Sequence, residues 1–156
     1  MNLSTHFTLE ECIVSDTAKR LGISNQPTEQ HLKSLKLLAE NIFEPIRNHF
    51  GKAIYVSSGY RSEALNKAIP GSSTTSQHCK GEALDLDQDG KGTGITNADV
   101  FKYIKDNLNF DQLIWEYGNS NNPDWVHVSY SPSGHQRKQV LKAIRTANGG
   151  VSYTNY

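Results

Sequence analysis

The chain has 156 residues, of which 36% are hydrophobic and 21% are charged, and this length allows one packed core. We therefore expect a single domain over residues 1–156. Lysine plus arginine equals aspartate plus glutamate, at 16 each, so charge gives no case for nucleic acid or an anionic membrane as a partner. No apolar run approaches the roughly 20 residues that span a bilayer, and the first residues lack the basic and apolar regions of a signal peptide. We expect no membrane span and synthesis as a soluble cytoplasmic protein.

The first third of the chain carries helix signals. Thr8 opens a capping-box pattern, and the segment 15–21 is typical of a short helix closed by glycine. Over residues 28–50 apolar side chains recur at helical spacing, which predicts a longer helix. Pro45 should kink or break this helix near its end.

The rest of the chain alternates short helices with strand-like runs. Runs rich in β-branched and aromatic residues predict strands at 53–59, 83–87, 111–118 and 125–131. The last two runs should form an antiparallel pair joined by an irregular loop. The run 139–145 fits a strand or a helix, and the turn signal after it favours a strand. Helices are expected at 63–68 and 98–107, the second capped by Asn97. The expected fold is α+β, with N-terminal helices packed on a mainly antiparallel sheet.

Two histidines and an acid on predicted strands suggest a metal site. In the stretch 76–87, which reads SQHCKGEALDLD, alternation puts Asp85 and Asp87 on one strand face. His127 lies within the strand-like run WVHVS. Together His78, Asp85 and His127 form the ligand set of a catalytic zinc site whose fourth position stays open for water. For each histidine taken alone, an ordinary hydrogen-bonded role in a strand is favoured, and spacing alone does not overturn it.

Calcium and cysteine chemistry are less well supported. The run 85–90 imitates the start of an EF-hand, but Thr96 stands where the twelfth-position glutamate would be, so we do not expect calcium. Cys12 and Cys79 lie far apart and form no Cys-x-x-Cys pair, so we expect ordinary free thiols.

Three motifs occur in a recognisable order: SSGYRS, then SQHCKGEALD, then DWVHVS. With them the chain resembles the zinc D-Ala-D-Ala carboxypeptidase family, which includes vancomycin-resistance D,D-dipeptidases and phage L-Ala-D-Glu endolysins. The resemblance extends over about residues 6–145 and is strongest to the compact phage or prophage branch. It implies that His78, Asp85 and His127 bind Zn²⁺. It also implies hydrolysis of peptide bonds involving D-amino acids in peptidoglycan stem peptides, as a D,D-carboxypeptidase or an endolysin-type endopeptidase.

The resemblance assigns roles to further residues. An acid three residues before the last family histidine acts as the general base, and here that residue is Asp124. Glu116 on the preceding strand is the rival, and each acid also fits an ordinary turn or strand end. Arg61 corresponds to the family arginine that binds the substrate carboxylate or polarises the scissile carbonyl. Ser76 either helps to hold the substrate or caps the turn before His78.

Two alternatives stay open on the sequence. One is a non-catalytic wall-binding or phage structural protein that keeps the fold, and the other is a zinc hydrolase of some other small peptide or amide. We see no separate wall-binding domain, so targeting should come from the domain itself, from a phage particle or lysis partners, or from soluble substrates. A phage-derived protein would act on the cell wall.

Overall fold

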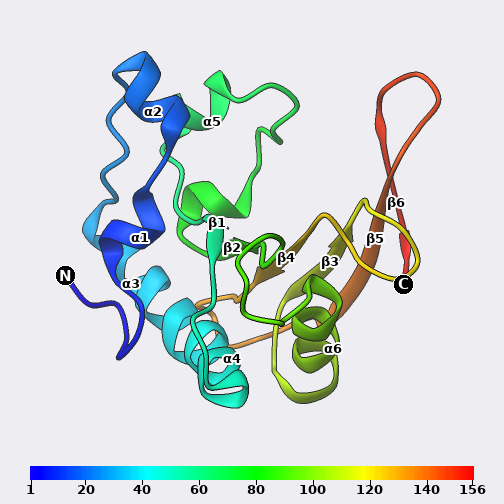
Figure 1. Ribbon diagram of the computed structural model, residues 1–156. Coiled ribbons are helices and arrows are strands. Elements are labelled where there is room, and N and C mark those ends of the chain that lie inside the picture. Colours follow the sequence, from blue (N-terminus) through cyan, green and yellow to red (C-terminus); the bar gives the residue numbers. More distant parts are fainter.

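The computed structural model describes residues 1–156 (Figure 1). The α-helices are α1 (Leu9–Ile13), α2 (Asp16–Leu21), α3 (Glu29–Leu38), α4 (Glu44–Phe50), α5 (Glu63–Ala68) and α6 (Asn97–Asn107). A π-helical turn, η1 (Ala39–Phe43), and a 3-10 turn, η2 (Gln77–Lys80), complete the helical elements. The strands are β1 (Val56–Ser58), β2 (Ala83–Leu86), β3 (Gln112–Glu116), β4 (Trp125–Ser129), β5 (Gln139–Arg145) and β6 (Val151–Asn155). The fold is α+β, as predicted. None of the helices is long and apolar enough to cross a membrane.

All six strands belong to one sheet in the order β1-β2-β4-β3-β5-β6. Every neighbouring pair is antiparallel except β3 and β5, which run parallel. The predicted antiparallel pairing of β3 with β4 and the strand at 139–145 are therefore confirmed. Because β5 continues the sheet beyond β3, the hairpin of β5 and β6 forms one edge of the sheet, as Figure 1 shows.

The two faces of the sheet differ in chemistry. Residues opposite each other on paired strands share a face. Leu84 pairs with Val128, and Val128 pairs with Leu113, so this face is apolar. On the next positions Asp85 pairs with His127, which places both of these polar side chains on the opposite face. The apolar face packs on the helices, and the polar face is available for a site.

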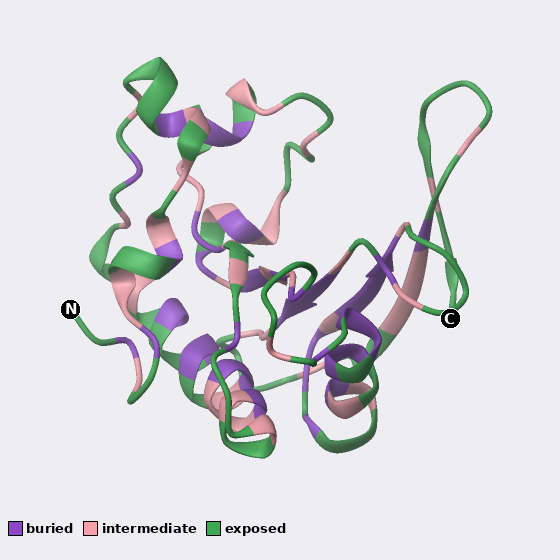
Figure 2. Cartoon of the chain, in the orientation of Figure 1, coloured by how far each residue is buried: buried purple, intermediate pink, exposed green.

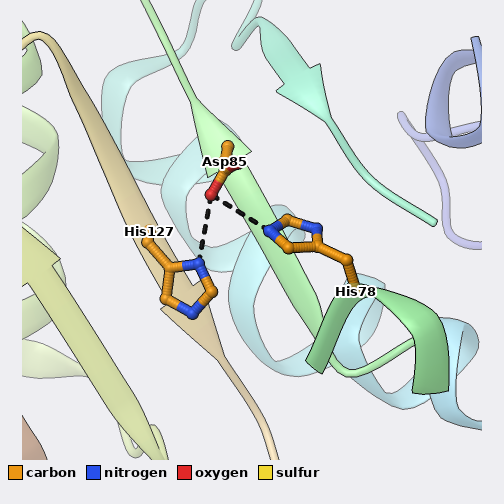
Figure 3. Close-up of side chains that lie close together, drawn as sticks. All are labelled: His78, Asp85 and His127. Atoms are coloured by element: carbon orange, nitrogen blue, oxygen red, sulfur yellow. Dashed lines mark hydrogen bonds and ion pairs between the residues drawn. The ribbon is translucent and has the colours of Figure 1, made fainter. Parts of the chain in front are cut away.

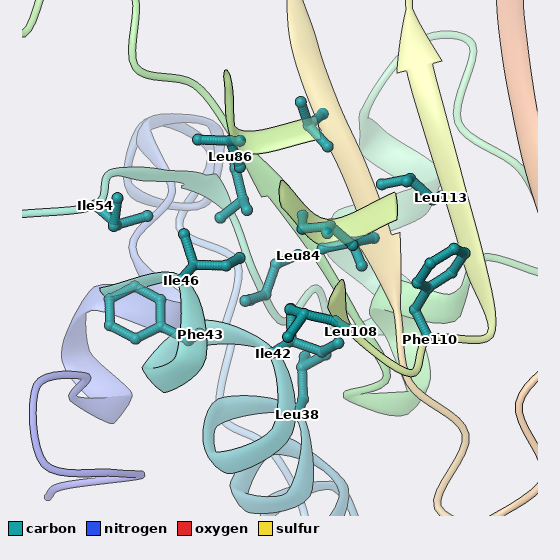
Figure 4. Close-up of a cluster of buried hydrophobic side chains, with 14 of the residues drawn as sticks. Leu38, Ile42, Phe43, Ile46, Ile54, Leu84, Leu86, Leu108, Phe110 and Leu113 are labelled. Carbon is teal, nitrogen blue, oxygen red and sulfur yellow. The ribbon is translucent and has the colours of Figure 1, made fainter. Parts of the chain in front are cut away.

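The core fills the space between the helices and the apolar face of the sheet. It contains 24 buried residues, with Leu38, Ile42 and Ile46 of the long helix near Leu84 and Leu86 of β2 (Figure 4). Each such side chain, when fully buried, stabilises the folded state by about 1.5–3 kcal/mol. Figure 2 shows the buried positions concentrated here, whereas the β5–β6 hairpin is mostly exposed. The sheet that carries the polar residues is thus held by helices on one side only.

The long helix predicted over residues 28–50 is continuous but irregular. Thr28 caps it as expected, and α3, η1 and α4 follow one another without a gap. Pro45 lies in the first turn of α4, directly after the π-helical turn. Since proline has no N–H for the helical ladder, an irregular turn before it is the expected consequence. The helix is therefore altered at this point, and it is not broken.

The strand predicted at 83–87 is shorter than expected. β2 ends at Leu86, so Asp87 does not share a strand face with Asp85. The Oδ1 atom of Asp87 instead accepts hydrogen bonds from Asn97 Nδ2 at 3.0 Å and from the Asp89 N–H at 3.1 Å. Asp87 therefore anchors the loop after β2.

Asn97 does not cap the following helix, contrary to the prediction. The cap is Thr96, whose side chain accepts from the Asp99 N–H. Asn97 is fully buried, and its side chain accepts from the Gln88 N–H at 2.7 Å and donates to the Asp124 carbonyl oxygen at 3.0 Å. Its side chain thus ties together loops that are distant in sequence, which local sequence reasoning cannot detect.

Candidate active site

His78, Asp85 and His127 meet on the polar face of the sheet (Figure 3). Asp85 and His127 are directly opposite each other on β2 and β4, and His78 reaches them from η2. Asp85 Oδ1 lies 3.2 Å from His78 Nε2 and 3.1 Å from His127 Nδ1. One ligand atom from each residue falls within 4.8 Å of the others, a spacing that fits a single metal ion. The structure therefore brings the three predicted ligands together.

Short capping interactions fix the turn that carries His78. Ser76 Oγ accepts a hydrogen bond from the His78 N–H at 3.2 Å, so Ser76 caps η2. Gly81 ends η2 with φ +73°, and a Cβ atom there would lie 2.8 Å from the His31 carbonyl oxygen. Only glycine fits that position without a shift of the backbone. Of the two roles considered for Ser76, the structure shows the capping one.

A backbone carbonyl sets the tautomer of His78. Its Nδ1 atom lies 2.7 Å from the Gly59 carbonyl oxygen. A carbonyl oxygen can only accept, so Nδ1 carries the proton in the neutral ring. His78 Nε2, which faces Asp85, is then left with its lone pair.

A side-chain relay sets the tautomer of His127. Gln77 Nε2 donates to Asp111 Oδ2 at 3.3 Å, and because an ionised carboxylate only accepts, the orientation of the Gln77 amide is fixed. Gln77 Oε1 therefore faces His127 Nε2, at 3.1 Å, and accepts a hydrogen bond from the protonated Nε2. The lone pair of His127 lies on Nδ1 and points at Asp85.

The electrostatics of this cluster fit a divalent cation. Burial alone would raise the pKa of Asp85, but the neighbouring rings of His78 and His127 hold that pKa well below its usual range, so its carboxylate is ionised. With both imidazoles neutral, two nitrogen lone pairs and one carboxylate oxygen converge on the same point without a proton between them. Such an arrangement is repulsive unless a cation occupies it. Two imidazole nitrogens and a carboxylate suit Zn²⁺ with one open position, so the residues present fit the predicted zinc.

The cluster opens into a cleft of about 860 Å³ on the polar face. Arg61, Ser76 and Glu116 line this cleft together with the three ligands. Glu116 is only 7% exposed, and burial raises the pKa of its carboxyl to about 7, with His127 opposing the rise and Asp85 adding to it. A buried acid with a pKa near neutrality can accept and release a proton at physiological pH.

Asp124 lies outside this cleft. It is exposed and borders an adjacent cavity of about 460 Å³, which shares Arg145 with the cleft. The alternation of side chains explains the difference, because an offset of three residues from His127 on an extended chain leads to the opposite face. Glu116 instead pairs with Trp125, two residues from His127 and on the same face. Of the two candidate bases, only Glu116 lies beside the cluster.

Arg61 lies at the edge of the cleft close to His78. Its backbone N–H donates to the His78 carbonyl oxygen at 3.2 Å, and its Nε atom is buried without a hydrogen-bond partner. A buried donor without a partner costs free energy unless a ligand satisfies it. Arg61 thus lines the cleft beside His78 and has one donor that the protein leaves unpaired.

Both cysteines are free. Cys12 is fully buried, and burial raises the pKa of its thiol to about 12. Cys79 is half-buried and is not part of the metal cluster. The expectation of ordinary thiols agrees with these positions.

Gly59, whose carbonyl orients His78, tolerates no side chain. A Cβ atom at this position would lie 2.4 Å from the Cys12 carbonyl oxygen. Because the backbone must shift, Gly59→Ala should lower the free energy of unfolding by about 1–3 kcal/mol and weaken zinc binding. Urea unfolding and zinc titration test this. Gly150→Ala is the control, since its Cβ would meet only the side-chain oxygens of Thr146 and Asn148, and equal stability of the two variants would contradict the prediction.

Asp111, which holds Gln77 in place, should contribute stability that depends on pH. Hydrogen bonding from Arg137 lowers the pKa of Asp111 below its ordinary value. Asp111 Oδ1 accepts from Arg137 Nε at 3.0 Å, and Oδ2 accepts from its terminal nitrogen at 2.8 Å. Asp111→Asn places an amide N–H₂ against these donors. The free energy of unfolding should therefore fall by about 1–3 kcal/mol near neutral pH.

The sign of the pH effect follows from the lowered pKa of Asp111. The stabilisation is fully present above the unfolded-state pKa of about 3.9, and is lost as the pH falls through the lower folded-state value. Urea unfolding of the wild type and of Asp111→Asn should therefore show a difference in the free energy of unfolding that disappears only below about pH 3.9. Asp106→Asn, at an exposed ion pair, is the control and should change stability little. A difference in the free energy of unfolding that stays unchanged in acid would contradict the role given to Asp111.

Sequence reasoning missed Gln77, Asp111 and Gly59. Gln77 and Gly59 both lie within the motifs that the sequence singled out, and Asp111 opens the third predicted strand. No local signal joins Gln77 to Asp111, since the contact depends on the packing of η2 against the start of β3. Their role in orienting the ligands became visible only with the fold.

Comparison with known proteins adds an independent finding. No curated protein matches the sequence significantly. The family described as peptidase M15 matches over residues 5–129, a range that includes the metal cluster, Arg61 and Glu116 and ends before the β5–β6 hairpin. Because this range covers more than half of the 156 residues, the chain belongs to the peptidase M15 family, whose members are hydrolases of peptide bonds.

Proposed function

We propose that this protein is a zinc peptidase that cleaves a bond involving a D-amino acid in peptidoglycan stem peptides. The observation that carries the proposal is the convergence of two imidazole lone pairs and a carboxylate beside the buried acid Glu116, within a chain of the peptidase M15 family. The cleft of about 860 Å³ is larger than a dipeptide requires, so a stem peptide of several residues is the favoured substrate. An endolysin-type endopeptidase therefore fits better than a dipeptidase.

The chemistry divides between the metal and the residues around it. Bound Zn²⁺ supplies a Lewis acid that polarises a carbonyl group and lowers the pKa of water towards neutrality. His78, Asp85 and His127 would hold it, and the Gly59 carbonyl and the Gln77 amide keep both imidazoles in the tautomer that can bind a metal.

Glu116 is the proposed general base, which replaces Asp124 as the first choice. It takes a proton from the attacking water as the new C–O bond forms, and returns that proton to the leaving amine nitrogen as the C–N bond breaks. Its pKa of about 7, raised by burial, suits both transfers. Arg61 is proposed to bind a carboxylate of the substrate through its planar guanidinium.

Digestion of purified peptidoglycan tests the proposal. Zinc-loaded protein should release peptide fragments with new amino termini, identified by mass spectrometry, and a chelator should abolish them. Binding to peptidoglycan without any fragment would favour the non-catalytic wall-binding protein. Cleavage of unrelated dipeptides but not of stem peptides would favour a hydrolase of other amides.

Arg61→Ala should keep zinc and the fold but lower kcat/KM for stem peptides by about 10–100-fold, the value of a lost charge-assisted hydrogen bond. Arg61→Lys should restore little, because an ammonium group cannot reproduce the guanidinium fork. Steady-state kinetics and zinc analysis measure both effects. Arg20→Ala on the exposed surface of α2 is the control, and wild-type turnover in Arg61→Ala would make Arg61 an ordinary structural residue.

A further inference from the structure

The β5–β6 hairpin forms one wall of the catalytic cleft although it lies outside the range matched by the peptidase family. The residues it contributes to the cleft are Gln139, Leu141, Arg145, Gly149, Val151 and Tyr153. The opposite wall is the loop at 69–76 between α5 and η2. Figure 1 shows these two segments rising on either side of the sheet. A substrate in the cleft would therefore contact the hairpin.

The strand register turns polar side chains of the hairpin towards the site. Ala143 of β5 pairs with Glu116 on one side and with Tyr153 on the other. Tyr153 itself lines the cleft, as do Leu141 and Arg145 of β5. The hairpin face seen by the substrate is thus the face that carries Ala143, Tyr153 and Arg145.

Arg145 is a guanidinium on this wall that is not neutralised by the protein. Its Cζ atom lies 4.0 Å from the centroid of the Tyr117 ring. No carboxylate of the chain forms an ion pair with it, whereas Arg137, the other arginine near this wall, is bound to Asp111. Stacking on the ring holds the guanidinium without using its N–H donors. The donors of Arg145 therefore remain available for a ligand.

Arg61 provides the same chemistry at the other side of the cleft, where its Nε has no partner. Two guanidinium groups without acidic partners thus line the cleft, one beside the loop wall and one on the hairpin wall, with the metal ligands and Glu116 between these walls. We propose that Arg145 forms a second carboxylate-binding subsite, so that the cleft selects an acidic oligopeptide with carboxylates on both sides of the cleaved bond. This inference rests on the proposed peptidase function, because it concerns the substrate of the same site.

Equilibrium binding tests the subsite separately from catalysis. The protein is the zinc-loaded Glu116→Gln variant, with and without Arg145→Gln. The reference probe is the stem pentapeptide that contains γ-linked D-glutamate and meso-diaminopimelate. In a second peptide the α-carboxylate of D-glutamate is a carboxamide. In a third peptide lysine stands in place of diaminopimelate, so the side-chain carboxylate is absent. Calorimetry gives the Kd of each peptide.

One of the two modified peptides should bind about tenfold more weakly than the reference, the size of one charge-assisted hydrogen bond. Arg145→Gln should abolish this difference, because it should weaken the binding of only those peptides that keep the recognised carboxylate. Lys142→Gln, on the opposite face of β5, should preserve it. Equal binding of all three peptides, or an equal loss for all three in Arg145→Gln, would overturn the subsite.

The outcome is distinct from a failure of the proposed function. If the wild-type protein cleaves the reference peptide but Arg145 gives no discrimination, the subsite is wrong and the peptidase stands. If discrimination depends on Arg145 but no peptide is cleaved, the subsite stands and the peptidase is wrong. Thermal unfolding of Arg145→Gln should match the parent, because Arg145 is exposed.

Discussion

Glu116→Gln should lower kcat/KM for peptidoglycan peptides by about 10²–10⁴-fold while one zinc per chain stays bound. The glutamine is nearly isosteric and keeps the packing of this buried side chain, but it cannot accept a proton. Since Glu116 lines the cleft and is not one of the three ligands, the loss should appear in kcat with little change in zinc content. Steady-state kinetics with parallel zinc analysis measure both.

Asp124→Asn is the matched control, because it makes the same chemical change directly before the neighbouring strand β4. Asp124 is exposed and borders a different cavity, so its variant should keep kcat/KM within about threefold, a change of under 1 kcal/mol. A far larger loss in Asp124→Asn than in Glu116→Gln would restore Asp124 as the base. If neither variant loses activity, the proposed proton transfer is wrong.

His78→Ala and His127→Ala should each lose most of the bound zinc and nearly all hydrolysis. Each change removes one of only three protein ligands, and the fourth position belongs to water. The loss of zinc separates these variants from Glu116→Gln, in which activity falls but the metal stays. Metal analysis by mass spectrometry after gel filtration gives the zinc content.

His135→Ala serves as the control for histidine removal. His135 is exposed in the β4–β5 connection and lies outside the cluster, so its variant should keep both zinc and activity. Full zinc content in both His78→Ala and His127→Ala would refute the assignment of the ligands.

Much of the fold was predictable because its signals are local. The capping residues Thr8 and Thr28, the strand pair around His127 and the strand at 139–145 were all identified from patterns within a few residues. The failures involve contacts between distant segments. Asn97 resembles a helix cap in sequence, but its buried side chain joins the loops around Gln88 and Pro123, and the preceding threonine caps the helix.

The site was predictable in its ligands but not in its surroundings. His78, Asp85 and His127 were recognisable because strand alternation and family resemblance agreed on them. The choice of base needed the fold, since Glu116 reaches the cluster through the pairing of β3 with β4. The relay through Gln77 and the hairpin wall depend on tertiary packing, which no pattern along the chain encodes.

Zinc titration of the chelator-treated protein tests the central claim most directly. Bound zinc and hydrolysis of peptidoglycan peptides are measured on the same samples as zinc is added. Because one cluster of three ligands is present, hydrolysis should be absent at the start and rise in proportion to bound zinc, with a plateau at one zinc per chain. Hydrolysis in the fully chelated protein, or none with one zinc bound, would contradict the account.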